Sequence, residues 1–93
     1  MDQIKSNDTI TIKLMSGEEV VTRLVEELDD VFVVSNPMAV VNLQSGIGLG
    51  PYVFTAQPHS HIPIVKKNVV SWCLTENNMA RKYAEGTTGL KLS

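Results

Sequence analysis

The sequence has few of the residues that restrict where a protein is found. Cys73 is the only cysteine in 93 residues, so the chain cannot form an internal disulfide and nothing indicates an oxidising compartment. No apolar run approaches the ~18 residues of a membrane-spanning helix, and the polar opening MDQIKSND does not resemble a signal peptide. We therefore expect a cytoplasmic protein with no membrane partner. Because no motif around Cys73 lowers its pKa, we expect it to be a buried structural thiol.

Acidic residues are missing from the middle of the chain. The net charge is −2, yet no Asp or Glu occurs from Val31 through Thr75, where the only formal charges are those of Lys66 and Lys67. This acid-poor stretch could approach a polyanion although the whole protein is not basic. The alternative is that buried strands simply lack charges.

Aromatic residues are also scarce, and the apolar content is mostly Val, Ile and Leu, which favours strands over helices. A chain of this length forms one domain and buries only ~60–65% of its unfolded surface. A domain with so small a core often gains stability from neighbouring subunits.

Two segments near the N-terminus predict a β-hairpin. Residues 9–15 alternate apolar and polar side chains, which is typical of a half-buried strand. Gly17 can take the positive φ that a hairpin turn needs. Residues 20–28 could be helical from their apolar content, but the short linker favours a returning strand.

The next segments predict further strands with turns between them. Asp29 and Asp30 favour a turn, because Asp side chains bond to their own backbone. The third strand, 31–34, should end at the Ser-Asn-Pro sequence before Pro37, and 38–43 should resume an extended run.

The second half of the chain predicts a loop, two more strands and a helix. Three glycines in 44–50 indicate a flexible loop or wide turn, and a fourth strand should begin at Pro51. The last strand should follow the lysine pair. A short helix should begin near Thr75 and stop at Gly86. Such a small meander must bend into a barrel or pack against another surface.

Several sequence segments resemble those of the Sm-like (LSm/Hfq) superfamily, and most closely those of the small Sm-like proteins of bacteriophages. They are 12–20, Leu24, Asp29-Asp30, Asn36-Pro37, 51–54, 64–70 and Tyr83. The resemblance implies a mainly all-β fold, a strongly bent five-stranded antiparallel barrel with a short helix near the C-terminus. The whole chain, 1–93, would be a single domain with its core at about 9–75 and a helix and tail at 76–93. Copies of the chain would pair edge to edge in a ring of about five to seven subunits, which removes exposed strand edges.

Members of this superfamily usually bind single-stranded, uridine-rich RNA, and the resemblance implies where the corresponding residues lie. An aromatic or planar side chain and an Asn in the third-strand loop contact the base; that Asn falls on Phe32 or Val33 here. The family's Arg-Gly-Asn turn becomes Val65-Lys66 or Lys66-Lys67, followed by Asn68, which keeps the family residue type.

The resulting nucleic-acid-binding candidates are Lys66, Lys67, Asn68, Asp30 and Phe32. Lysines repeated around a ring would form an anion site, and exposed aromatic rings would stack on bases.

Each candidate also has an ordinary structural interpretation. The lysines could be a solvated turn, Asn68 could stabilise its own turn, and Phe32 fits a strand core. Tyr52 could lie on a wall or at a subunit contact, and Trp72 in the core or at an interface. The acids at the end of the second strand are interpreted as a solvated face that discourages edge pairing.

No pattern in the sequence indicates catalysis, a metal or a cofactor. His59 and His61 have a ligand-like spacing but no evident third ligand, and Ser60 between them has no orienting acid. The sequence therefore predicts a non-enzymatic, homo-oligomeric, Sm-like ring that binds single-stranded nucleic acid in the cytoplasm, the host cytoplasm if it comes from a phage. The alternative is a phage scaffold or protein-interaction ring that binds no nucleic acid.

Overall fold

The first hairpin forms as its alternating sequence predicts. The computed structural model describes residues 4–57 and 59–88. β1 (Thr9–Leu14) pairs antiparallel with β2 (Glu19–Glu27), and Gly17 in the turn has a φ of +99°. Alternate residues of β1 are buried: Ile10, Ile12 and Leu14.

The third strand is longer than its sequence predicts. β3 (Val31–Leu43) runs through Pro37, so the expected break at this proline is wrong. Asn36 and Pro37 lie opposite the single residue Thr22 of β2, which makes a bulge, and Asn36 has a φ of 50°. Asn is among the few residues that tolerate this left-handed conformation. The bulge bends the strand instead of ending it.

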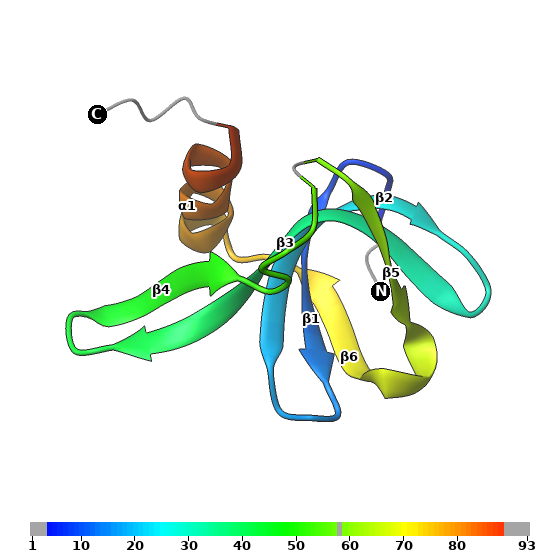
Figure 1. The fold of residues 1–93 in the computed structure, drawn as a ribbon, viewed down its shortest axis with the longest axis horizontal. Helices are drawn as coiled ribbons and strands as arrows, with labels where there is room; N and C mark the ends of the chain where they lie inside the picture. The colour runs from blue at the N-terminus through cyan, green and yellow to red at the C-terminus, as the bar shows by residue number, and fades with distance from the viewer. Residues whose placement is uncertain (1–3, 58, 89–93) are drawn as a thin grey trace.

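The glycine-rich segment is a strand and not the expected loop. β4 (Gly46–Pro51) pairs with the second half of β3, and the hairpin they form extends away from the rest of the sheet (Figure 1). A Cβ atom on Gly48 would lie 2.7 Å from Leu43 Cδ1, so the absence of a side chain lets Leu43 lie across the hairpin. The strand predicted to begin at Pro51 is wrong, because Pro51 ends β4 and turns and bends follow it in 52–56.

The last strands leave the sheet open. β5 (His61–Val65) pairs with the first half of β3, a 3₁₀ turn spans Lys66–Asn68, and β6 (Val69–Leu74) pairs with β1. The order is β4-β3-β2-β1-β6, with β5 on β3, and every pairing is antiparallel. The prediction of a mainly β antiparallel fold with a C-terminal helix is confirmed. The five-stranded barrel is wrong, because residues 4–57 and 59–88 form six strands in a sheet that is not closed, with β5 not paired to β6.

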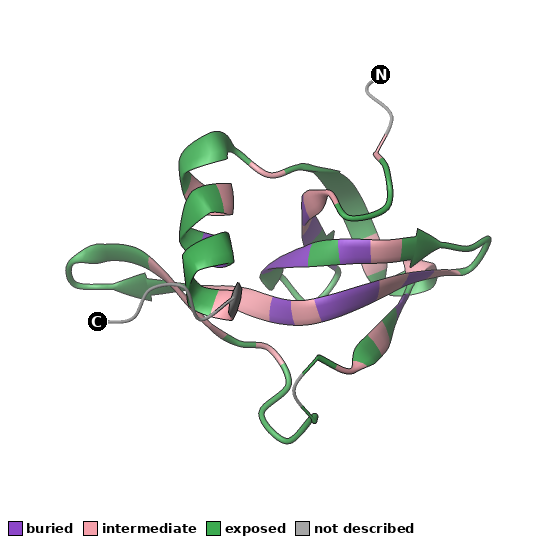
Figure 2. Ribbon diagram, turned by 90° about the horizontal axis from the view of Figure 1, so that it is seen from above, coloured by how far each residue is buried: buried purple, intermediate pink, exposed green. Residues whose placement is uncertain are grey.

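The core lies between the bent halves of this sheet and is small (Figure 2). The buried cluster comprises Ile10, Ile12, Leu14, Val20, Leu24, Phe32, Val34 and Ile64. On β6, Trp72 and Leu74 pair with Ile12 and Ile10 and so face the same side of the sheet. They nevertheless remain 45% and 43% exposed, because the described residues cover them only in part; the Trp72 ring contacts the ring of Phe32.

The C-terminal helix is attached to the bulge of β3. α1 (Asn77–Thr88) continues past the expected stop at Gly86. Tyr83 of this helix is only 4% exposed. Its hydroxyl group lies 2.9 Å from the carbonyl oxygens of Ser35 and Asn36. The hydroxyl oxygen also accepts a hydrogen bond from the Arg23 backbone N–H at 3.1 Å. Burial raises the pKa of Tyr83.

The start of α1 is capped by the side chain of Glu76. The Glu76 carboxylate accepts hydrogen bonds from the backbone N–H groups of Asn78 and Met79 at 2.9 and 3.0 Å, and these bonds lower its pKa. The predicted tail at 89–93 lies outside the described residues. Across the part of the chain that the structure describes, no helix is long and apolar enough to cross a membrane.

Candidate nucleic-acid interface

Three turns meet where the sequence places its candidate residues. The backbone N–H of Lys66 donates to the Asp30 carbonyl at 2.9 Å, which joins the 3₁₀ turn to the β2–β3 turn. The Met15 N–H donates to the Asn68 carbonyl at 2.8 Å, which joins the same 3₁₀ turn to the first hairpin. Four of the five candidates, Asp30, Lys66, Lys67 and Asn68, therefore lie on adjoining turns.

Lys66 is already engaged within the chain. Its Nζ atom lies 2.8 Å from Glu27 Oε2 and 5.0 Å from the centre of the Phe32 ring, an ion pair combined with a cation–π contact. The Lys66 side chain is 23% exposed and that of Glu27 is 41% exposed. Sequence reasoning placed Glu27 among solvated acids and missed this role. The register of the β2–β3 hairpin sets Glu27 opposite Phe32, so a correct register was the only available signal.

Phe32 belongs to the core and offers no free face to a base. It is fully buried, and its ring meets that of Trp72 edge-on, with centroids 5.2 Å apart and planes at 64°. Lys66 occupies a position over the Phe32 ring. Of these two aromatic residues, only Trp72 reaches the surface.

Lys67 and Asn68 are the accessible candidates on the 3₁₀ turn, and Asp30 on the neighbouring turn is exposed as well. Lys67 and Asn68 are both exposed, and among the described residues no side-chain hydrogen bond or ion pair involves either of them. Short 3₁₀ turns place consecutive side chains in different directions, which explains how Lys66 packs inward while Lys67 remains in solvent. The lysine pair is thus one engaged cation and one free cation.

Acids surround this end of the molecule. Glu26 and Glu27 end β2, and Asp29 and Asp30 form the following turn; all four are exposed. Four carboxylates against the two lysines make the neighbourhood of the 3₁₀ turn negative within one copy. A polyanion would therefore contact Lys67 locally, without a broad positive field around it.

A cavity of about 330 Å³ lies beside Asn68, between the first hairpin and β5. Tyr52 lies on the wall of this cavity. The other lining residues are Leu14, Met15, Ser16, Pro63, Ile64, Val65 and Asn68. Apolar side chains and one exposed amide make it a surface on which a flat ring could rest.

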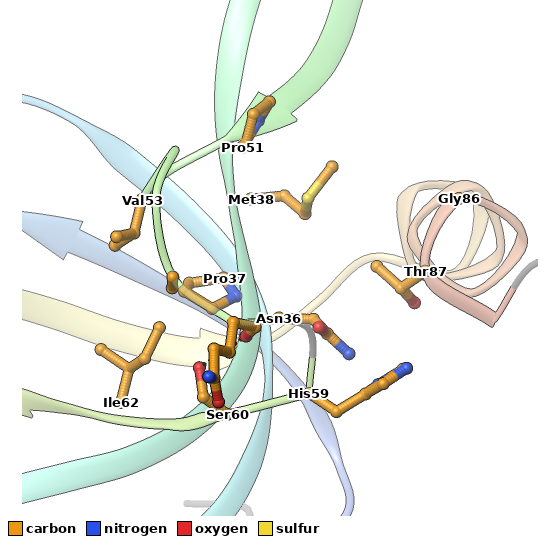
Figure 3. Close-up of a pocket in the computed structure, with 12 residues that line it drawn as sticks. Asn36, Pro37, Met38, Pro51, Val53, His59, Ser60, Ile62, Gly86 and Thr87 are labelled. Atoms are coloured by element: carbon orange, nitrogen blue, oxygen red, sulfur yellow. Dashed lines mark hydrogen bonds between the residues drawn. The ribbon is translucent and has the colours of Figure 1, made fainter.

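A second cavity, of about 300 Å³, lies between β3, the loop before β5 and the end of α1 (Figure 3). Asn36 and His59, both with positive φ, lie on its wall. His61 does not line it, so the cavity does not join the two histidines. Within residues 4–57 and 59–88 no group of three or more His, Cys, Asp or Glu side chains could hold a metal ion. Cys73 is exposed, so the expectation of a buried thiol is wrong.

Comparison with protein-family models finds no match to this chain, and comparison with curated proteins finds no significant relative.

Proposed function

We propose that the protein is an Sm-like module whose copies join into a ring and bind single-stranded, uridine-rich RNA without catalysis. The observation that carries the assembly is the open sheet. Among the described residues, β4 and β6 end the strand order and β5 has a partner on one side only, while Trp72 and Leu74 on β6 stay partly exposed. Free edges and exposed apolar side chains together favour pairing with another copy.

The pairing would join unlike edges, because the two ends of the sheet are different strands. Contacts of this head-to-tail kind close into rings when the rotation between copies allows it. Covering Trp72 and Leu74 would add apolar burial, worth about 25 cal/mol per Å², to a chain with a small core. This supports self-association as a source of stability.

Lys67 and Asn68 support the RNA-binding part of the proposal. Each copy exposes one unpaired ammonium group and one unpaired amide on the same turn. A ring would repeat them around one axis, where the lysines would contact phosphates and the amides would contact base edges.

Two measurements test this proposal. Native mass spectrometry should find closed oligomers. A gel shift with oligo-U should show retention that weakens with salt in the parent and is lost in Lys67→Ala, with the oligomer intact. Lys13→Ala, which removes an exposed lysine of the first hairpin, is the matched control and should bind as the parent does. A monomer, or equal binding by Lys67→Ala and the parent, would contradict the proposal.

The alternative is a ring that binds proteins and no nucleic acid. The engagement of Lys66 by Glu27, the burial of Phe32 and the acids around the turn favour it. Oligomers that give no oligo-U shift at micromolar protein would support this alternative.

A further inference from the structure

The Lys66–Glu27 pair has the geometry of a lysine–phosphate contact. A lysine bound to an anionic oxygen has an N–O distance of about 2.7–2.9 Å, and the Lys66–Glu27 distance is 2.8 Å. The Phe32 ring holds the ammonium group from one side. The Glu27 carboxylate therefore occupies a position where a phosphate oxygen could bind Lys66.

The two lysines differ in what an incoming strand must displace. Lys67 has no such contact among the described residues, so a phosphate needs only to displace water and counterions there. At Lys66 the same phosphate must first displace Glu27, and the displaced carboxylate remains nearby as a like charge. Exposed ion pairs of this kind change an equilibrium by about fivefold or less, so the competition tunes binding without abolishing it.

We propose that Glu27 is an internal competitor for the RNA backbone, which withholds Lys66 from phosphate and so sets the affinity and salt dependence of the interface. This inference rests on the RNA-binding function proposed above. It assigns Glu27 an affinity-determining role that its place in an acidic run does not suggest. Lys67 makes the contact in the parent protein, and Lys66 adds a second contact only when Glu27 is removed.

The test measures oligo-U binding by fluorescence anisotropy over a series of salt concentrations. Glu27→Gln keeps the shape of the side chain and removes its charge, and it should tighten binding by about two- to fivefold per engaged copy. Each added phosphate contact steepens the slope of log K against log salt by about 0.7 for a single strand. With Lys66 joining Lys67 in every engaged copy, the slope should roughly double.

Two further variants separate this competition from a general effect of charge. Glu26→Gln removes the same charge from the adjacent residue, which is exposed and forms no ion pair with any residue that the structure describes. It should change affinity by less than about twofold at 0.15 M salt, because screening weakens distant charges. Glu27→Gln combined with Lys66→Ala should return the salt slope to that of the parent.

The outcomes distinguish this inference from the proposed function. If the parent binds and Glu27→Gln has the same slope of log K against log salt as the parent, the competitor role is overturned and RNA binding stands. Equal gains in affinity from Glu26→Gln and Glu27→Gln would have the same meaning. Binding by Glu27→Gln alone would overturn the tuning role, because a competition worth about fivefold or less cannot hold the parent inactive. No binding by any variant would overturn both.

Discussion

Replacing Tyr83 with Phe removes one hydroxyl group from the point where α1 meets the bend of β3. That hydroxyl accepts a hydrogen bond from the Arg23 N–H and contacts two carbonyl oxygens, those of Ser35 and Asn36. The Ser35 oxygen keeps a second donor, the Thr22 hydroxyl at 2.7 Å. The main loss is therefore the acceptor for the Arg23 N–H.

A buried donor left without a partner costs about 1–3 kcal/mol. Because the Arg23 N–H is only part-buried, we expect Tyr83→Phe to lower the free energy of unfolding by about 1 kcal/mol, the low end of that range. The ring stays in place, so no cavity forms. The matched control is Tyr52→Phe, because the Tyr52 hydroxyl makes no hydrogen bond among the described residues; its effect should stay within about 0.5 kcal/mol. Urea unfolding followed by circular dichroism measures both.

The pH dependence of the free energy of unfolding of the same two variants separates a polar role of Tyr83 from simple packing. Burial raises the pKa of Tyr83, so above about pH 10 the unfolded chain loses its phenolic proton before the folded chain does. The stability contributed by this group is complete below pH 10 and is lost as the pH rises through the folded pKa. The parent and Tyr52→Phe should therefore lose stability in alkali more steeply than Tyr83→Phe. Equal unfolding midpoints for the two variants, with parallel alkaline profiles, would refute the reasoning.

Two other predictions concern the backbone. Gly46 has a φ of +128°, so Gly46→Ala should lower the free energy of unfolding, measured by urea titration, by about 1–3 kcal/mol. The control Gly50→Ala, at an ordinary φ and with no atom near its added Cβ, should cost less than about 1 kcal/mol. Equal costs would contradict the role of Gly46 in the hairpin turn. Glu76→Gln should weaken the start of α1 at neutral pH, seen as faster hydrogen exchange at Met79, because the ionised carboxylate is the better acceptor. Since its folded pKa is lowered, the parent should lose this protection as the pH falls from about 4.5 through the folded pKa, and unchanged exchange in the variant would contradict the cap.

Local patterns predicted the elements that depend on neighbouring residues. The alternation of 9–15 and Gly17 identified the first hairpin, and the change of composition after Thr75 identified the helix. The failures have tertiary causes. The 44–50 segment looks like a loop because glycine is a poor strand former, yet pairing with β3 overrides this preference. Pro37 looks like a strand end because it lacks an N–H, yet the bulge at Asn36 carries the strand past it.

The candidate interface was predictable only in part, because its turns depend on local sequence whereas the contacts between them depend on tertiary pairing. The lysine turn and the Asp29-Asp30 turn could be identified separately, but their contact depends on β5 pairing with β3. Glu27 lies 39 positions before Lys66, and the two side chains meet because β2 and β5 both pair with the start of β3. Phe32 is buried as its strand-core interpretation expected, but the unbroken apolar run 31–34 does not by itself show which of its side chains face inward.

The bulge in β3 fixes which way the protruding hairpin faces. Side chains in a strand point alternately to opposite sides, so deleting Asn36 would send every residue from Met38 onward to the other side, and β4 would follow through its pairing. Adding or removing residues at the hairpin tip, Gln44 and Ser45, does not change which side the side chains nearer the sheet face. The projecting arm can thus change in length at its tip, whereas its base must keep its residue count.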